Sequence, residues 1–157
     1  MEALKTELLQ PKTGLTPSDI GASAAESARL DLKKLNRVTV TVALGTGTGT
    51  TLDFSLKQHD AAAAGNSKAL TSTLPYYYAA DVDAAMTRVD AGGALDADGN
   101  LDTAAGIVEV PVHLDDMDAD NGFHWASLEI AASGTARIVS MVYHCDTKNK
   151  PAYEIEL

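Results

Sequence analysis

Cysteine is almost absent from the chain, which contains only Cys145. One cysteine excludes a disulfide within the chain and a thiolate metal cluster built by a single copy. Long apolar runs are missing too, and charged residues interrupt the first ten positions, MEALKTELLQ. We therefore expect no membrane-spanning helix and no secretory signal, and a soluble protein made in a cytoplasm.

Aromatic residues are also scarce, at 5% of the 157 residues. A chain of this length is typical of one domain with a single core. That core must be built mainly from Val, Leu and Ile, with few large aromatic anchors. We therefore expect self-association to contribute to stability.

Basic residues are outnumbered, because 12 Lys and Arg stand against 22 Asp and Glu, for a formal net charge of −10. Residues 1–40 are nearly neutral, so the acidity belongs to the rest of the chain. Proteins bind nucleic acid chiefly through Lys and Arg that displace counterions from phosphates. The charge therefore argues against nucleic acid and anionic membranes as partners, and it suits a basic protein surface.

Motifs for catalysis or cofactor binding are absent as well. His59, His113, His124 and His144 show no spacing typical of a metal site, and there is no nucleophile elbow of the form GxSxG. The segment GTGTGTT at 45–51 lacks the lysine and the following helix of a phosphate-binding loop. We therefore expect no cofactor and no enzymatic activity.

The strongest pattern that is present is strict alternation of apolar and polar residues over 37–58, on both sides of the glycine-rich segment. Such alternation is typical of half-buried strands, and two runs across a glycine-rich connector predict a hairpin. The apolar positions are Val38, Val40, Val42, Leu44, Leu52, Phe54 and Leu56.

Later segments continue the strand pattern. The run 106–114 alternates but contains Pro111, which predicts an edge or bulged strand because proline cannot donate to a ladder. FHWASLEIA at 123–131 predicts another strand, ARIVSMVYHC at 136–145 a central one, and AYEIE at 152–156 a short last one. Turn signals every eight to twelve residues and the lack of a βαβ rhythm predict a mainly β fold, an antiparallel β-sandwich.

The first 36 residues follow a different pattern. Residues 2–10 are good helix formers that Pro11 ends, and residues 19–35 place apolar side chains at helical spacing after Ser18. The chain is therefore divided into an N-terminal arm with short helices at 1–36 and a β-sandwich domain at 37–157. The arm either packs on its own sheet or reaches a neighbouring subunit.

Three consecutive tyrosines, Tyr76, Tyr77 and Tyr78, supply most of the aromatic surface. Neighbouring residues of a strand point to opposite faces, so at least one should be buried and at least one exposed. An exposed tyrosine suits an interface, because it brings contact area with little rotamer entropy. An ordinary role as a sheet aromatic is the alternative.

Two acidic loops are candidates for cation binding. Asp96, Asp98, Asn100 and Asp102 occupy the first four ligand positions of a calcium loop, but its glycine and its final glutamate are missing. The loop 115–122 is similarly incomplete. Each is either a solvated turn or a weak structural cation site.

Two blocks, TLDFSLKQHDAAAAGNSKAL at 51–70 and HLDDMDADNGFHWASLEI at 113–130 with ARIVSMVYH after it, resemble small virion proteins of tailed bacteriophages. The similarity is to head decoration or cement proteins with a jelly-roll-like sandwich. It implies many copies on the outer surface of the virion capsid, bridging major capsid protein subunits, with self-association as a homodimer or homotrimer.

The resemblance also leads to a hypothesis about contact residues. Intersubunit contacts are assigned to the arm and to the tyrosine strand, and deletion of residues 1–16 is expected to abolish capsid binding without unfolding the β domain. The assigned residues are Leu4, Leu8, Leu9, Leu15, Tyr76, Tyr77 and Tyr78.

Two other classes of function compete with this one. A calcium-dependent carbohydrate-binding or adhesion module of a fibre would use the acidic loops, and chelator would lower its melting temperature. An enzyme with a site assembled from distant residues would need a concave pocket that holds perturbed acids.

Overall fold

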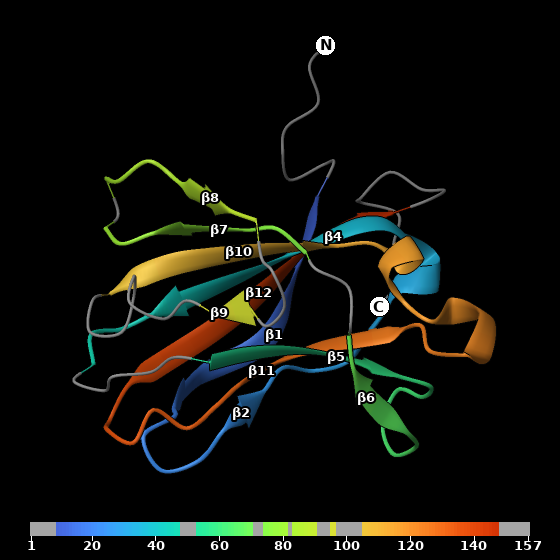
Figure 1. Cartoon of the computed structure of the whole chain (residues 1–157), viewed down its shortest axis with the longest axis horizontal. Helices are drawn as coiled ribbons and strands as arrows, with labels where there is room; N and C mark the ends of the chain where they lie inside the picture. The colour runs from blue at the N-terminus through green and yellow to red at the C-terminus, as the bar shows by residue number, and fades with distance from the viewer. Residues whose placement is uncertain are drawn as a thin grey trace.

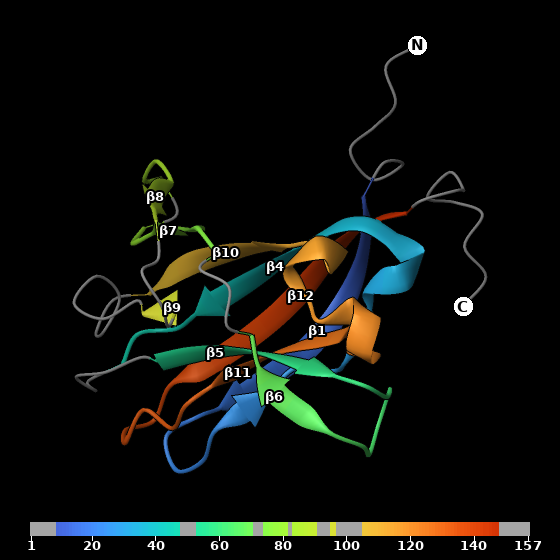
Figure 2. The same ribbon diagram turned by 45° about the vertical axis from the view of Figure 1, so that its right-hand side comes forward.

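The computed structural model describes residues 9–47, 53–70, 74–81, 83–90, 95–96 and 105–147. Within these residues the protein is mainly β, with two antiparallel sheets stacked as a sandwich, which confirms the predicted antiparallel β-sandwich but not the helical arm (Figures 1 and 2). The described helices are short 3₁₀ turns: η1 (Leu32–Lys34), η2 (Leu114–Asp116) and η3 (Ala119–Asn121). No helix in the described part of the chain has the length and apolar character needed to cross a bilayer.

The two sheets are called sheet A and sheet B. Sheet A has the spatial order β1 (Gln10–Asp19), β12 (Ile138–Thr147), β4 (Leu35–Leu44), β10 (Gly106–Val112), β7 (Tyr76–Ala79) and β8 (Thr87–Val89). Sheet B has the order β2 (Ala25–Glu26), β11 (Trp125–Ile130), β5 (Asp53–His59) and β6 (Ser67–Ala69), with β3 (Leu30–Asp31) paired to β11 and β9 (Leu95–Asp96) paired to β5.

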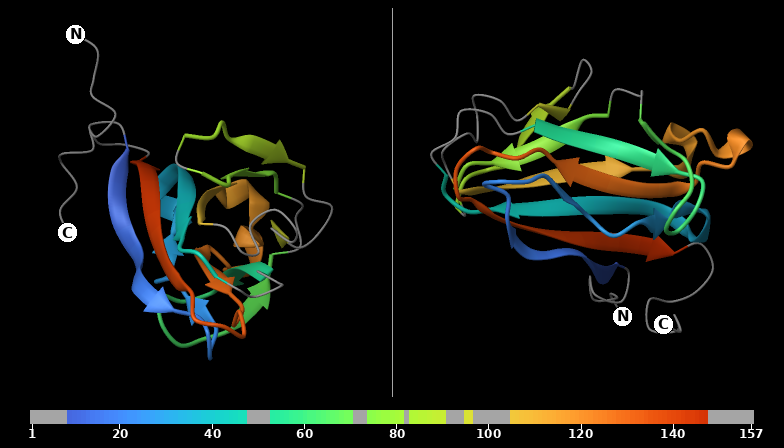
Figure 3. Two further views of the ribbon diagram at one scale, coloured as in Figure 1. Left: turned by 90° about the vertical axis from the view of Figure 1, so that its left-hand side faces the viewer. Right: turned by 90° about the horizontal axis from the view of Figure 1, so that it is seen from below.

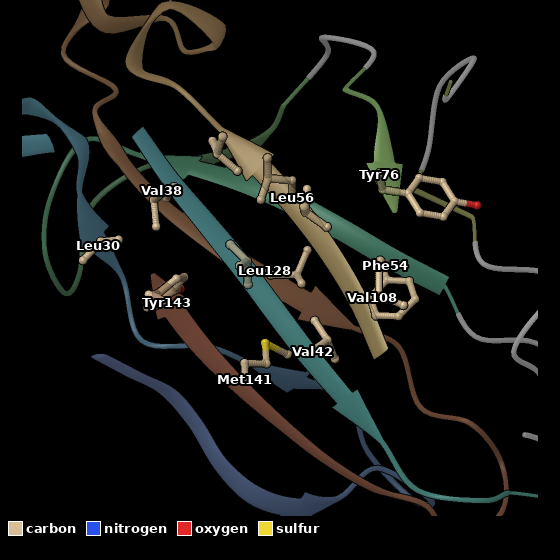
Figure 4. Close-up of a cluster of buried hydrophobic side chains, with 14 of the residues drawn as sticks. Leu30, Val38, Val42, Phe54, Leu56, Tyr76, Val108, Leu128, Met141 and Tyr143 are labelled. Atoms are coloured by element: carbon tan, nitrogen blue, oxygen red, sulfur yellow. The ribbon is translucent and has the colours of Figure 1, made fainter. Parts of the chain in front are cut away.

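The core lies between the sheets and is built from every second residue of the long strands. Val42 and Met141 point inward from sheet A, and Phe54 and Leu128 point inward from sheet B (Figure 4). Burial of these apolar side chains is the main favourable term in folding, at about 25 cal/mol for each Å² of apolar surface removed from water. The alternation in the sequence therefore identified the inward face of each strand.

The predicted hairpin across the glycine-rich segment is wrong. β4 pairs with β12 and β10 in sheet A, whereas β5 pairs with β11, β6 and β9 in sheet B. The connection thus passes from one sheet to the other. Alternation fixes which side chains point into the core, but both sheets face the same core, so the pattern does not determine which strands become neighbours.

The helix predicted at 19–35 is also wrong, whereas the one predicted at 2–10 lies outside the described residues except for Leu9 and Gln10. Residues 10–19 form β1 along β12, β2 and β3 pair with β11, and helical structure in the described part of 9–36 is limited to η1. Pro11, Pro17, Gly14 and Gly21 are poor helix residues, and pairing with β12 and β11 satisfies the backbone of this segment instead. The described N-terminal residues are therefore part of the sandwich, and residues 1–8 lie outside the described structure.

β12 lies between β1 and β4, which confirms the prediction that it is central (Figure 3). β10 lies between β4 and β7, but its described pairing with β7 covers only 107–109. Pro111 is beyond that pairing and has a strand partner on the β4 side alone, opposite Thr39. The missing N–H of Pro111 is therefore accommodated where β10 has one neighbour, as expected for a locally edge position.

The hydroxyl of Tyr143 links the two sheets inside the core. It lies 2.6 Å from the Ser27 Oγ and donates to the Ala28 carbonyl at 2.6 Å, and the Leu128 N–H donates to the same Ser27 Oγ at 2.9 Å. Burial raises the pKa of Tyr143 to about 12. The phenol therefore stays neutral and fixes the segment between β2 and β3 against β12.

Replacement Tyr143→Phe is expected to lower the free energy of unfolding by about 1–3 kcal/mol, because Ala28 and Ser27 lose a buried partner. Urea unfolding measures the change. Tyr77→Phe, at a half-buried position of β7, is the control and should stay within about 0.5 kcal/mol of the unaltered protein. Equal stability of the two variants would contradict this role for Tyr143.

Asp19 holds the end of β1 to the turn that precedes β12. Its Oδ1 accepts from the Arg137 N–H at 2.9 Å and from the Gly21 N–H at 2.8 Å, and these bonds lower the pKa of Asp19 from its ordinary value of 3.8. A lowered pKa stabilises the fold above the ordinary pKa, and that contribution is lost as the pH falls through the lowered value.

The stability difference between the unaltered protein and Asp19→Asn should therefore be constant above about pH 5 and shrink below it as the carboxylate is protonated. Urea unfolding at a series of pH values measures this difference. A difference that grows as the pH falls would contradict the assigned hydrogen bonds.

Candidate functional site

The outer face of sheet A is the first candidate site. On β4, β10 and β12 the residues between the core positions point away from the core, and most of them are uncharged. The charged members of this set are Glu109 and the pair Arg37 and Asp146, whose Nε and Oδ2 atoms lie 3.7 Å apart. Ile138 is 53% exposed although it is a large apolar side chain. The outer face of sheet A comprises Arg37, Thr39, Thr41, Ala43, Ile107, Glu109, Pro111, Ile138, Ser140, Val142, His144, Asp146 and, from β7 and β8, Tyr77 and Arg88.

The strand register arranges these side chains in rows across the sheet. Val142 is opposite Thr13 on one side and Thr41 on the other, Thr41 is opposite Glu109, and Glu109 is opposite Tyr77. Thr41 Oγ1 donates to Glu109 Oε1 at 3.5 Å. Tyr77 is in turn opposite Arg88. β-branched and small side chains in a regular ladder make a broad surface of low net charge, which suits contact with a protein more than capture of a small molecule.

The tyrosine strand divides its side chains between the two faces of sheet A, as alternation predicts. Tyr76 is buried in the core, and Tyr78 is opposite Val108 and packs against the same core. Tyr77 is the member on the outer face, where it is half-buried, so the prediction that at least one of the three is exposed is not met. Of the tyrosines assigned to contacts, Tyr77 is therefore the one whose position suits an interface.

The arm leucines assigned to contacts are spread over different environments. Leu15 lies in β1 and packs against the core, and Leu9 is half-buried just before β1. Leu4 and Leu8 lie outside the described residues. The four leucines thus do not form one described surface.

A polar cluster on the outer face of sheet B is the second candidate site. Ser127 Oγ donates to Glu26 Oε1 at 2.6 Å and lies 2.7 Å from His59 Nε2. Lys57 Nζ forms an ion pair with the Glu129 carboxylate and lies 3.9 Å from Glu26 Oε2. β5, β11 and β2 bring these side chains together, because their register places them in adjacent positions across the sheet.

His59 and Ser127 are each 1% exposed, and His59 Nδ1 is buried without a hydrogen-bond partner among the described atoms. Desolvation lowers the pKa of His59, with a further contribution from Arg29. In a nucleophilic triad the carboxylate orients the imidazole through Nδ1. Here Glu26 contacts the serine side of the pair, and the imidazole lacks that orienting partner.

Sequence inspection missed this cluster, because its members are far apart in the chain and their spacing carries no motif. Positions 26, 59 and 127 become neighbours only through the pairing of β2, β11 and β5. Arg29 adds a further long-range link, since its Nη1 donates to the carbonyls of Ala61 and Ala64 at 3.1 Å each and also to that of Ala63. The pairing of strands was the information that the sequence did not supply.

Two carboxylates of the acidic loop 115–122, Asp116 and Asp118, bind protein groups. Asp116 Oδ2 accepts from the His113 N–H at 2.8 Å, and Asp118 contacts Lys68 and Asn121. Hydrogen bonds from Lys68 and Asn121 lower the pKa of Asp118. Over the ranges that the structure describes, no three His, Cys, Asp or Glu side chains converge as a metal site would require.

The other acidic loop is described only in part. The backbone of Asp96 belongs to β9, and Asp98, Asn100 and Asp102 lie outside the described residues. The predicted cation site there stays a prediction.

Comparisons with known proteins do not assign the chain to a family. No family model and no curated protein matches it. A chain from a structure of infectious bursal disease virus, Gx strain, aligns with 12% identity and a TM-score of 0.24, over 89% of this chain and 40% of that chain. So low a TM-score is a weak structural match, on which we base no conclusion.

Proposed function

We propose that the protein is a structural protein of a tailed-phage virion, which binds the outer surface of the head and bridges neighbouring major capsid protein subunits. In this role it acts by holding other proteins together and catalyses no reaction. The partner class comes from the sequence resemblance of residues 51–70, 113–130 and 136–144 to head decoration proteins.

The outer face of sheet A is the observation that carries the proposal. It is broad, its two cations Arg37 and Arg88 balance its two carboxylates Glu109 and Asp146 in a chain with a formal net charge of −10, and it exposes Ile138. Charged residues are depleted from the centres of protein interfaces, because each one must be desolvated on binding. The acidic remainder of the surface would steer the protein toward a basic partner and set the rate of encounter more than the affinity.

The Ser127 and His59 pair on sheet B supports a role without catalysis. Both side chains are buried, and the carboxylate contacts the serine where a triad would need it on the imidazole. A general base must also reach its substrate within hydrogen-bond distance. This cluster instead stabilises the sheet by pairing its own polar groups.

The test is the composition and stability of particles from the strain that encodes the protein. Quantitative mass spectrometry of purified heads should find many copies per particle. Particles stripped of the protein should regain both the copies and their heat resistance when the purified protein is added. Absence from purified heads, or add-back without binding, would contradict the proposal.

A further inference from the structure

The turn between β10 and β11 contains the one Asn–Gly pair of the sequence, Asn121–Gly122. Asn121 is exposed at the end of η3, and Gly122 caps that turn with a φ of 89°. In Figure 3 this segment, drawn in orange, projects from one end of the sandwich. Water therefore has access to the Asn121 side-chain amide, which has no part in either candidate site described above.

An asparagine side chain can react with the backbone nitrogen of the residue that follows it. In this reaction the Gly122 nitrogen loses its proton to solvent and bonds to Asn121 Cγ, while the bond from Cγ to Nδ2 breaks and ammonia leaves with a proton taken from water. Water then opens the resulting five-membered succinimide ring, which gives aspartate or isoaspartate at position 121. The attack is intramolecular and water is its sole co-reactant, so it needs no enzyme, oxidant or reductant.

Glycine after the asparagine favours this ring closure for two reasons. It has no side chain to shield the attacking nitrogen, and its backbone accepts conformations that other residues adopt at a cost. Apart from its chain neighbours, no atom of the described residues lies within 4 Å of the place that a Cβ of Gly122 would take, so there is room for the ring. The other described asparagines, Asn36 and Asn66, precede Arg37 and Ser67, whose side chains hinder the same attack.

Hydrogen bonds engage both reacting groups in the closed turn. Asn121 Nδ2 donates to Asp118 Oδ1 at 2.7 Å, and the Gly122 N–H donates to a carbonyl of η3 at 3.0 Å. Asp118 is held in turn, because its N–H donates to Gln58 Oε1 at 2.9 Å and its Oδ2 pairs with Lys68. The bonds to Nδ2 and to the Gly122 N–H must open before the ring can close, so the rate depends on local opening of the turn.

We propose that Asn121–Gly122 is a self-modification site, at which the protein deamidates spontaneously at a rate limited by its contacts with Asp118. The product has a carboxylate at position 121, which cannot donate to Asp118 and repels its carboxylate. Lys68 pairs with Asp118 and lies 4.1 Å from the centre of the Phe123 ring, so the change extends to the contact between this turn and β6. The reaction belongs to the chain alone, so its outcome is independent of the virion role proposed above.

The first test locates the modified residue. Purified protein is kept in warm, mildly alkaline buffer, and peptide mapping by mass spectrometry follows each asparagine with time. The peptide that contains Asn121 should gain the mass that separates OH from NH₂ and should include isoaspartate. Asn66 is the internal control, because its Nδ2 donates to Asp60 Oδ2 at the same distance of 2.7 Å but Ser67 follows it. Faster reaction at Asn66 than at Asn121 would overturn the proposal.

The second test removes the restraint. Asp118→Ala should deamidate at Asn121 roughly tenfold faster or more, because the hydrogen bond from the amide to a charged group is lost. Asp115→Ala, which removes an exposed carboxylate from the same loop, is the matched control and should leave the rate unchanged. Circular dichroism checks that both variants fold. An unchanged or slower rate in Asp118→Ala, or no reaction in it after many half-times of the free peptide ADNGFH, would overturn the proposal.

The third test follows the consequence of the reaction. Asn121→Asp mimics one product, and its peptides from 113–123 and from β6 should exchange amide hydrogen for deuterium faster than those of the unaltered protein. Peptides from β12 are the internal control, because that strand lies between β1 and β4 and should keep its exchange rate. Asn121→Gln should remove the acidic form that isoelectric focusing separates on storage. Unchanged exchange in Asn121→Asp, or an acidic form that appears as fast in Asn121→Gln, would contradict the proposal.

Discussion

Deletion of residues 1–16 is expected to unfold the protein, contrary to the expectation that these residues form a dispensable arm. The deletion removes Gln10 to Thr16 of β1, which supplies most of its pairing with β12. It also removes the Gly14 carbonyl that accepts from the Ala28 N–H at 2.7 Å, and it opens the core beside Tyr143. The decrease in the free energy of unfolding should be comparable to the whole stability of a small domain, roughly 5–15 kcal/mol.

Far-ultraviolet circular dichroism and urea unfolding measure this effect. Deletion of residues 1–8 is the matched control, because it removes none of the described pairing. The shorter deletion should keep the midpoint of unfolding. Its binding to particles then shows whether Leu4 and Leu8 contribute to the contact. A cooperative transition at an unchanged midpoint after deletion of 1–16 would show that β1 is not part of the stable fold.

Replacement Val142→Glu is expected to reduce binding to particles at least tenfold while changing the melting temperature little. Val142 is half-buried on the outer face of sheet A, in the row that contains Thr41 and Glu109. Docking would have to desolvate the new carboxylate in the same row as Glu109, and an unpaired buried charge is costly. In the free protein the same carboxylate remains in contact with water, so folding is affected much less.

Ser67→Glu is the matched control for charge, because Ser67 is exposed on β6 in sheet B. Co-sedimentation of each variant with stripped particles measures binding, and thermal unfolding checks the fold. Equal binding by Val142→Glu and the unaltered protein would remove the outer face of sheet A from the interface. Equal loss in both variants would indicate an effect of net charge alone.

The sequence predicted where the long strands lie and which of their residues are buried, because alternation reflects burial on one face. β4, β10, β11 and β12 lie where the alternating runs are, and the inward residues such as Val40 and Val110 are buried. The same alternation could not predict pairing partners, since both sheets bury side chains in one core. The connection between β4 and β5 is therefore a crossing between sheets, although it was predicted as a hairpin.

The helix predicted in the N-terminal segment was wrong for a different reason. Residues 19–35 contain alanine and leucine at helical spacing, and a helix is a reasonable expectation for them in isolation. In the folded chain, β2 and β3 pair with β11, and the Ser27 Oγ bonds to Tyr143 more than 100 positions away. Such long-range partners override local propensity and are not visible in a local pattern.

The candidate sites also depend partly on alternation, which the sequence shows, and partly on strand pairing, which it does not. Alternation correctly predicted that the tyrosine strand divides between two faces, and the register then places Tyr77 opposite Glu109 on the outer face. The cluster of Glu26, His59 and Ser127 depends wholly on the pairing of three strands. It could be found only from the folded structure.

Electron cryo-microscopy of the particles tests the central claim most directly. The proposal predicts density for the protein on the outside of the head, with Val142 and Tyr77 in contact with major capsid protein subunits and the Ser127 face of sheet B turned away. Heads without such density, or density in which sheet B makes the contact and the outer face of sheet A is free, would contradict the account.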